Sequence, residues 1–270
     1  MRLLHLVITG SKLHNTSIAT SDTDVKGIGF AEVGELLGLE KLDQEKVNNG
    51  KLGTEKIEGV IETVERQINF IYKGDLSGTE TCFADDRFVV WTTPLGKEIC
   101  EFSRNNLLCR KLFKSYSGYF LSQLRKLDTS IRIGGRAEDQ MKYGYDRKMA
   151  MHAYRLGKQA LNIMRNRTLN PTLDLADSFV ARALRAGEYD KDYILTMLGN
   201  LDVAMKKAYD ESTLRDEVDF QFVNNFVIDL HVRYIKGEFD SQFILPVDKN
   251  SMINAIQNKA RQLNGIASAS

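Results

Sequence analysis

Short apolar runs rich in β-branched residues mark the chain up to about residue 92. Four of them have the length and composition of β-strands: LLHLVI, DVKGIGF, GVIETV and RFVVW. Glycine-containing turns and one amphipathic helical segment, VERQINFIY, separate these runs. We therefore predict an α/β (α+β) core with a mixed sheet over residues 1–92.

The rest of the chain follows the period of α-helices. Pro94 and Pro171 stand at or before predicted helix starts, where the missing N–H costs no hydrogen bond. The segment 128–144 has no clear period and contains Gly134 and Gly135, so we expect a mobile connection there. We predict an all-α helical domain over residues 93–270, with helices over 94–127, 146–165, 174–187, 190–208 and 219–236.

The composition is that of an ordinary folded protein: 270 residues, 43% hydrophobic, 27% charged and only three prolines. A net charge of +1 gives no overall field that would draw the chain to nucleic acid or anionic lipid. The three cysteines form no C-x-x-C pair, which argues against a zinc site or a disulfide framework. The amino-terminal apolar run is too short for a signal sequence or a membrane span, so we expect a cytoplasmic protein.

Asp22 and Asp24 stand one residue apart at the start of a predicted strand. Because side chains alternate between the faces of a strand, both carboxylates project from one face and repel each other. A turn at residues 21–22 followed by a solvated strand would tolerate this. Alternatively, a divalent cation offsets the repulsion, since Mg²⁺ is commonly held by carboxylates and substrate phosphates. Gly10 and Ser11 would then form an adjacent phosphate site, because a backbone without Cβ lets a phosphate approach free N–H groups.

Four stretches of the sequence are similar, in order, to the motifs of one known family: GSKLHNTSIATSDTDVKGI (10–28), IYKGDLSGTETCFA (71–84), TPLGKEICEFSRNNLLCRKLFKSYSGYF (93–120) and GYDRKMAMHAYRL (144–156). They resemble the nucleotidyltransferase superfamily of the polymerase-beta type, and within it the RNA-ligase-associated, RlaP-like branch. There are two departures. HNTSIAT stands where the family has a segment with glycine and proline, and GDLSGTETC lacks the Asn-Pro of the family motif.

The resemblance implies two Mg²⁺ (or Mn²⁺) ions held by Asp22, Asp24 and a third carboxylate on a later strand. The predicted strand in KIEGVIETV offers Glu58 and Glu62, which alternate onto the same face. We favour Glu62, because it stands at the end of the strand just before a helix, and keep Glu58 as the alternative. Both would otherwise be ordinary exposed strand glutamates.

The helix predicted over 146–165 carries a second candidate group. Lys148, His152 and Arg155 form a cationic stripe beside an apolar one. Alone, such a stripe is usually a solvated helix face. The resemblance implies that Lys148 and Arg155 neutralise phosphate oxygens and that His152 bonds a phosphate or the leaving pyrophosphate. With Tyr145 as a base-stacking ring, these residues would form a triphosphate clamp.

The resemblance thus implies an enzyme that moves a nucleoside monophosphate from a nucleoside triphosphate, such as ATP, to a hydroxyl acceptor and releases pyrophosphate. The acceptor would be an RNA end, a protein or a small molecule, and the sequence does not select among them. The alternative is a non-catalytic nucleotide-binding or interaction protein on the same fold, because a fold does not determine a function.

Overall fold

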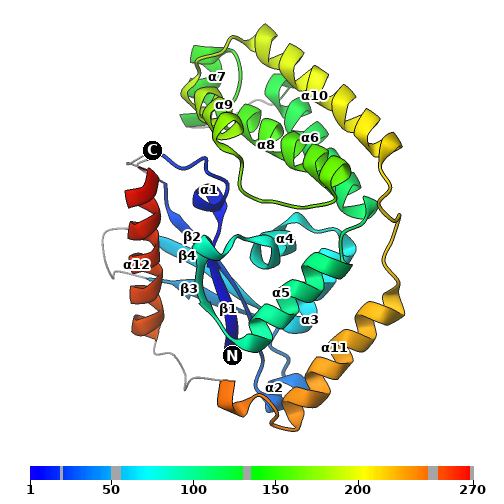
Figure 1. Ribbon diagram of the computed structural model, residues 1–270. Coiled ribbons are helices and arrows are strands. Elements are labelled where there is room, and N and C mark those ends of the chain that lie inside the picture. The colour runs from blue at the N-terminus through cyan, green and yellow to red at the C-terminus, as the bar shows by residue number, and fades with distance from the viewer. Residues whose placement is uncertain (19–20, 50–55, 130–134, 243–248, 268–270) are drawn as a thin grey trace. The chain divides into compact units, whose positions relative to one another are not determined.

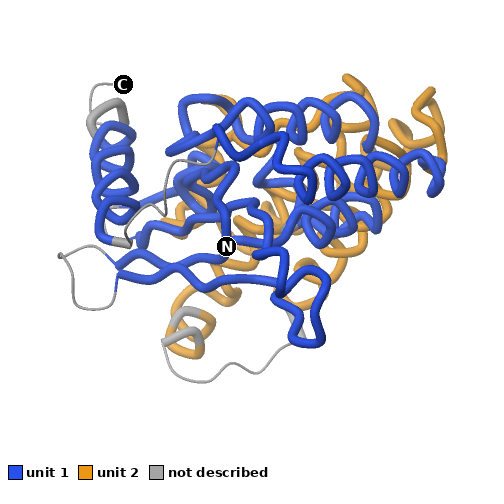
Figure 2. Tube along the Cα trace, turned by 90° about the horizontal axis from the view of Figure 1, so that it is seen from below, with its two compact units in different colours: residues 1–107, 218–270 blue, residues 108–217 orange. Residues whose placement is uncertain are grey.

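The computed structural model describes residues 1–18, 21–49, 56–129, 135–242 and 249–267. The chain divides into two compact units, and each is described by itself (Figure 2). Unit 1 comprises residues 1–107 together with 218–270, and unit 2 comprises residues 108–217. This division differs from the predicted boundary between residues 92 and 93, because helices from both ends of the predicted helical domain belong to the unit that contains the sheet.

Unit 1 is built on a five-stranded mixed sheet with the order β3–β4–β2–β1–β5. β2 and β4 are parallel, and the other neighbours are antiparallel. The four predicted strands are present, whereas β3 was not predicted because Val47 is its single buried residue and no apolar run marks it. The strands are β1 (Arg2–Ile8), β2 (Thr23–Phe30), β3 (Gln44–Asn48), β4 (Ile57–Thr63) and β5 (Val89–Thr92).

One face of the sheet is covered by α12 (Lys249–Ala267), as Figure 1 shows. Ile253, Ile256 and Ala260 of this helix are buried in a core with apolar side chains of β1, β2, β3 and β4. Each isoleucine buried in this way stabilises the fold by roughly 1.5–3 kcal/mol. The helix was not predicted, because a narrow stripe of buried positions is set among many polar residues.

The opposite face of the sheet carries three helices (Figure 1). Val7, which points away from the α12 side, packs there with Leu13 and Ala84. Arg104 donates 2.7 Å hydrogen bonds to the carbonyl oxygens of Cys82 and Ala84, which connects two of these helices. The three helices are α3 (Val64–Lys73), α4 (Leu76–Phe83) and α5 (Pro94–Asn106).

The chain comes back to unit 1 through α11 (Phe220–Ile235). Tyr234 of this helix stacks on Phe30, with ring centroids 4.2 Å apart, and donates a 3.0 Å hydrogen bond to the carbonyl of Ala31. These contacts tie α11 to the end of β2. The remaining short elements of unit 1 are α1 (Gly10–Leu13), α2 (Val33–Leu37) and 3-10 turns at Asp86–Phe88 and Asp240–Gln242.

The described residues of unit 2 form helices and their connections. The predicted apolar stripe of α8 is buried, including Met149, Leu156 and Ile163. Asp146, at the N-cap of α8, accepts a 3.1 Å hydrogen bond from the backbone N–H of Met149 and so satisfies a donor of the first turn. The helices are α6 (Arg110–Thr129), α7 (Gly135–Tyr143), α8 (Arg147–Asn166), α9 (Leu175–Ala186) and α10 (Lys191–Glu211).

The segment 128–144 is more regular than predicted. α6 continues to Thr129, and α7 begins at Gly135, whereas Gly134 lies outside the described residues. Met141 in α7 is almost fully exposed, and none of the α7 residues whose burial the structure describes is buried, so the sequence shows no helical period there. Residues 135–143 nevertheless form a helix.

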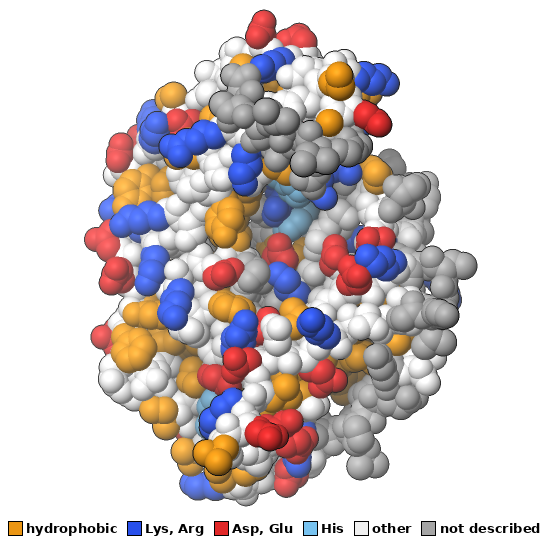
Figure 3. Space-filling view, turned by 180° about the vertical axis from the view of Figure 1, so that it is seen from behind, with side chains coloured by type: hydrophobic (Ala, Val, Ile, Leu, Met, Phe, Trp, Pro, Cys, Tyr) orange, Lys and Arg blue, Asp and Glu red, His pale blue; other side chains and the backbone are white. Residues whose placement is uncertain are grey.

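No helix in the described part of the chain is long and apolar enough to cross a membrane. On the face drawn in Figure 3, Lys and Arg side chains are interspersed with Asp and Glu. This mixture agrees with the net charge of +1.

Candidate functional site

The end of β1 meets the start of β2 at Gly10 and Asp24. The backbone N–H of Thr9 donates a 2.8 Å hydrogen bond to the carbonyl of Asp24 and so continues the pairing of the two strands. Gly10 has a φ of +63°, which glycine adopts without strain. A Cβ on Gly10 would overlap with Oδ2 of Asp24. The turn at Gly10 and Ser11 therefore lies directly against the Asp24 carboxylate, so close that only glycine fits.

Three carboxylates gather at this end of the sheet: Asp22, Asp24 and Glu58. Glu58 is the register partner of Asp24 on the parallel strand β4, so the two side chains share a face. Burial raises the pKa of Asp24, and the negative charges of Asp22, Glu80 and Glu58 raise it further. The side chains of Asp22 and Glu58 are 52% and 55% exposed, so the group is open to water.

Lys56 bridges two of these carboxylates. Its Nζ lies 2.8 Å from Oε1 of Glu58 and 4.0 Å from Oδ2 of Asp22. The hydrogen bond to Glu58 is the main reason that the pKa of Lys56 is raised. A cationic side chain thus already occupies the side of Asp22 and Glu58, as expected where acidic groups repel each other.

Glu62 does not belong to this group. Its register partner on β2 is Ile28, four residues beyond Asp24, which corresponds to about 13 Å along the strand. Glu62 is largely buried there and forms a 2.7 Å ion pair with Nε of Arg66. Burial raises the pKa of Glu62, and the charge of Arg66 opposes this rise. The register contradicts the prediction of Glu62 as the third carboxylate beside Asp24, and Glu58, the alternative, has that position.

Glu80, to which the sequence analysis gives no role, lies near Asp24. It comes from α4 and forms an ion pair of 2.9 Å with Lys26 and a contact of 3.1 Å with Nε2 of His14. Lys26 follows Asp24 on the same face of β2 and lowers the pKa of Asp24. Glu80 lies in the segment IYKGDLSGTETCFA, which resembles a family motif, and this could have drawn attention to it. The helix that directs Glu80 toward β2 was not predicted.

The carboxylates suit a cation that takes its remaining ligands from a substrate and from water. In the described part of the chain, no three His, Cys, Asp or Glu side chains are prearranged to hold a metal ion. Mg²⁺, however, is usually held by one or two carboxylates, with substrate phosphates and water as its other ligands. Asp22 and Asp24 supply the carboxylates, and the Gly10 backbone lies directly against the Asp24 carboxylate. These residues fit a magnesium ion that arrives with a triphosphate.

Lys148, His152 and Arg155 lie on one half-buried face of α8 at the spacing i, i+4, i+7. Nη1 of Arg155 donates a 3.1 Å hydrogen bond to Oε1 of Gln159, whose Nε2 donates to the carbonyl of Pro171 at 2.7 Å. This chain of bonds fixes the direction of the guanidinium. Because these residues belong to unit 2, whereas Asp22 and Asp24 belong to unit 1, the predicted clamp stays a prediction.

Tyr145 is part of the core of unit 2. Its side chain is 1% exposed, and its hydroxyl donates a 2.9 Å hydrogen bond to the carbonyl of Tyr189. A base cannot stack on a ring that is covered on both faces. The structure therefore contradicts the predicted stacking role, because the aromatic ring directly before the helix fills the core of the unit.

Two other histidines of unit 1, His5 and His231, are at least partly buried. His231 bonds the Val227 carbonyl through Nδ1 and Glu65 through Nε2, at 2.7 and 3.1 Å. His5 is enclosed between the sheet and its helices, and among the described residues neither of its ring nitrogens has a hydrogen-bond partner in normal geometry. Burial lowers the pKa of His5 to about 4, so the ring is neutral near pH 7.

Comparison with known proteins adds little to this geometry. No family model matches the chain. No curated protein matches it either. Among solved structures, the chain is similar to a nucleotidyltransferase-like protein from Exiguobacterium sibiricum 255-15, with a TM-score of 0.30 and 6% identity. The match covers 77% of this chain and 69% of that one, and we base no inference on so low a similarity.

Proposed function

We propose that the chain is a metal-dependent nucleotidyltransferase, which moves a nucleoside monophosphate from a nucleoside triphosphate to a hydroxyl acceptor and releases pyrophosphate. The observation that carries the proposal is the contact of Gly10 with the Asp24 carboxylate. The contact places the Gly10 backbone, whose N–H groups can bind a phosphate, directly beside Asp24. The carboxylates of Asp24 and Asp22 repel each other. A phosphate would accept hydrogen bonds from the N–H groups, and a divalent cation would offset the repulsion between the carboxylates.

In this proposal the Gly10–Ser11 turn binds a phosphate of the substrate. The backbone N–H groups and the Ser11 hydroxyl donate hydrogen bonds to its oxygens. Asp22 and Asp24 hold Mg²⁺ or Mn²⁺, and Glu58 replaces Glu62 as the third carboxylate, beside Asp24 in the sheet register. When bound, the metal stabilises the charge that develops on the transferred phosphoryl group and lowers the pKa of the attacking hydroxyl.

Glu80 and Lys26 act on Asp24 through charge. Lys26 favours the ionised form of Asp24, the form that binds a cation, and opposes the effects of burial and like charges. Glu80 holds the Lys26 ammonium in place with an ion pair of 2.9 Å, and His14 contacts the other oxygen of the Glu80 carboxylate. Glu80 is therefore a positioning residue, because its own charge is engaged by two partners.

The cationic face of α8 is the proposed clamp for the triphosphate. Arg155 suits a bidentate contact with phosphate oxygens, Lys148 acts as a point charge, and His152 donates a hydrogen bond. The Gln159 contact supports this role for Arg155, because it limits the directions in which the guanidinium points. The acceptor is an RNA end, a protein or a small molecule, and ATP is one candidate donor.

One observation favours a second function, a nucleotide-binding module without catalysis. Lys56 neutralises Glu58 and lies close to Asp22, so a lysine takes part of the place that a second metal ion would need. A protein that binds a triphosphate with one cation, and transfers nothing, would have this arrangement. Nucleotide binding without turnover distinguishes the module from the enzyme.

The deciding experiment offers nucleoside triphosphates labelled at the α-phosphate, with Mg²⁺ or Mn²⁺, to the purified protein and an extract of its source cell. We expect label in an acceptor and release of pyrophosphate, both lost in the Asp22→Asn/Asp24→Asn variant, which lacks the metal-binding carboxylates. A folded variant with unchanged activity would remove the metal site from the proposal. Nucleotide binding without labelled product in the wild type would select the binding module.

A further inference from the structure

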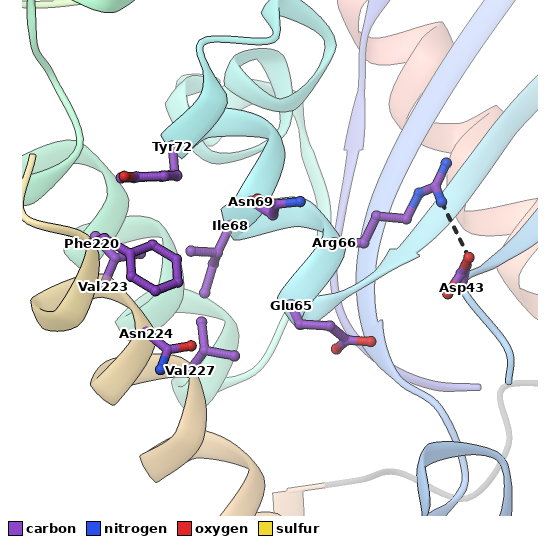
Figure 4. A pocket seen from close by; sticks show the side chains of 10 residues that line it. All are labelled: Asp43, Glu65, Arg66, Ile68, Asn69, Tyr72, Phe220, Val223, Asn224 and Val227. Atoms are coloured by element: carbon purple, nitrogen blue, oxygen red, sulfur yellow. Dashed lines mark hydrogen bonds and ion pairs between the residues drawn. The ribbon is translucent and has the colours of Figure 1, made fainter. Parts of the chain in front are cut away.

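A cavity of about 380 Å³ lies between α3 and α11 in unit 1 (Figure 4). This volume falls within the range of pockets that hold small molecules, roughly 300–1,000 Å³. Ile68 of α3 and Val223 and Val227 of α11 give it an apolar floor. Tyr72 and Phe220 stand at one end, with ring centroids 5.8 Å apart and planes tilted by 57°. The Phe220 side chain is 59% exposed, so a large apolar ring is left uncovered at the mouth.

The charged groups around this cavity are already paired. Glu65 contacts His231 at 3.1 Å; burial lowers the pKa of His231, but the bonds to Glu65 and to the Val227 carbonyl, together with the Glu65 charge, raise it overall. Arg66 points away from Phe220 and forms ion pairs with Asp43, at 3.4 Å, and with Glu62 (Figure 4). A phosphate would have to break these pairs to be neutralised. The cavity is therefore suited to an uncharged ligand.

Two carboxamides supply the remaining polar groups. Asn69 of α3 and Asn224 of α11 line the cavity, one from each helix, and neither side-chain carboxamide makes a hydrogen bond in the part of the chain that the structure describes. Each carboxamide offers an acceptor beside a donor, the pattern that pairs with adjacent donor and acceptor groups on the edge of a heterocycle. Aromatic rings next to such groups provide faces on which a planar ligand stacks.

We infer that this cavity binds an uncharged, planar nitrogen heterocycle of nucleobase size, such as the base of a nucleoside. The ring stacks on Phe220 and covers its exposed face, and the carboxamides of Asn69 and Asn224 bond its edge. The ligand needs no phosphate, because the charges around the cavity are neutralised within the protein.

This site is distinct from the proposed triphosphate site. Asp24 pairs with Glu58 near the start of β4, whereas α3 begins directly after the end of β4. The two sites therefore lie at opposite ends of the parallel strand pair. The inference does not depend on nucleotidyl transfer, and an inactive protein would still bind the heterocycle.

Calorimetric titration of the full chain with adenosine tests this site. We expect saturable binding that Asn224→Leu or Phe220→Ala weakens about tenfold or more, the loss expected for a paired carboxamide or a stacked base. Asn225→Leu and Phe222→Ala are the matched controls, because both residues are exposed on α11 and neither lines the cavity. Purine riboside, which lacks the exocyclic amino donor, should bind roughly three- to tenfold more weakly than adenosine.

Asp24→Asn separates this inference from the proposed function. It should leave adenosine binding unchanged while it removes metal-dependent turnover. Adenosine binding that Asp24→Asn weakens and Asn224→Leu does not would place the ligand at the triphosphate site and overturn the inference. The absence of saturable binding would also overturn it, as would equal losses in Asn225→Leu and Asn224→Leu, or equal affinities for adenosine and purine riboside.

Discussion

The two ends of the β2–β4 strand pair present carboxylates on one face of the sheet, in opposite surroundings. At the amino end, Asp24 and Glu58 are register partners in an open, acidic group beside Gly10. At the carboxyl end, Glu62 is enclosed and paired with Arg66 of the following helix. Strand alternation puts all three side chains on the same face. The position along the strand, and the element that follows, determines which carboxylate adjoins the Gly-Ser turn.

The electrostatic causes also differ between the two ends. Burial raises the pKa of both Asp24 and Glu62. At Asp24 neighbouring carboxylates add to the rise, whereas at Glu62 the charge of Arg66 opposes it. At the amino end, Asp22, Asp24 and Glu58 share one bridging lysine, Lys56, whereas at the carboxyl end Arg66 pairs directly with Glu62. The proposed metal site is therefore expected at the amino end of the strand pair.

The largest expected effect is the difference in turnover between the Glu58→Gln and Glu62→Gln variants. Glu58→Gln should lower metal-dependent turnover about 100-fold or more, because the loss of a metal ligand removes several kcal/mol of transition-state stabilisation. Glu62→Gln, at the other end of the strand, should stay within a few fold of wild type. Steady-state pyrophosphate release measures both.

Thermal unfolding of the two variants is the control. Glu62→Gln should change the free energy of unfolding more than Glu58→Gln, because Glu62 is largely buried and paired with Arg66, whereas Glu58 is exposed. The comparison fails if Glu62→Gln abolishes turnover in a folded protein while Glu58→Gln leaves it intact.

The next effect concerns the contact of Gly10 with Asp24. Gly10→Ala would combine an unfavourable positive φ with a Cβ that overlaps Oδ2 of Asp24, so the carboxylate must move. We expect a loss of roughly 1–3 kcal/mol in the free energy of unfolding and a loss of Mg²⁺-dependent nucleotide binding. Urea denaturation and calorimetry measure the two.

Gly144→Ala is the matched control, because Gly144 also has a positive φ, +76°, but among the described residues no atom beyond its chain neighbours lies within 4 Å of the position of its Cβ. It should cost stability through backbone strain and leave nucleotide binding unchanged. If Gly10→Ala binds Mg²⁺ and nucleotide as Gly144→Ala does, the Gly10 contact has no part in the site.

The sequence predicted the elements of the site better than their neighbourhood. β1, β2, β4 and α8 follow local patterns of apolar residues, which a single sequence reveals. The register between β2 and β4 depends on pairing across the sheet, so alternation could give the face of Glu62 but not its distance from Asp24. The sequence predicted the helix α11 but not its packing against the sheet, because the stack of Tyr234 on Phe30 joins residues far apart in sequence.

Two residues show the limit for single side chains. Tyr145 precedes the helix that carries the proposed clamp. Its hydroxyl donates a hydrogen bond to the carbonyl of Tyr189, a residue that the sequence alone does not place nearby. Glu80 was overlooked because the sequence of α4, LSGTETCF, has no apolar stripe of helical period and follows a turn at Gly74. In both cases the chemistry of the residue was visible, but the tertiary partner that gives it a role was not.

A third prediction uses pH and Mg²⁺ to separate the two ends. Because the folded-state pKa values of Asp24 and Glu62 are raised above their ordinary 3.8 and 4.5, each group favours the folded state in acid, and this contribution is lost as the pH rises through the raised pKa. Bound Mg²⁺ reverses the loss at Asp24 only. At tenfold excess over its Kd, Mg²⁺ should add about 1.4 kcal/mol near pH 7 and nothing below the pKa.

Thermal unfolding across this pH range, with Mg²⁺ or with NaCl of the same ionic strength, measures the difference. Glu62→Gln should keep the Mg²⁺-dependent stabilisation, and Asp24→Asn should lose it. Mg²⁺ that stabilises Asp24→Asn as much as wild type, or that ceases to stabilise Glu62→Gln, would move the metal site away from the amino end of the strand pair.

The smallest effect is expected at Lys56. Its ammonium neutralises Glu58 and lies near Asp22, so it competes with a metal ion for the same carboxylates. Lys56→Gln should raise the affinity for Mg²⁺ about two- to fivefold, the size of an exposed ion pair. Lys46→Gln, an exposed lysine on β3, removes the same charge elsewhere on the sheet and should change the affinity little. Equal affinities in wild type and Lys56→Gln would mean that Asp22 and Glu58 do not hold the ion. A gain of turnover in Lys56→Gln would show that this lysine, rather than a missing carboxylate, limits catalysis at the amino end.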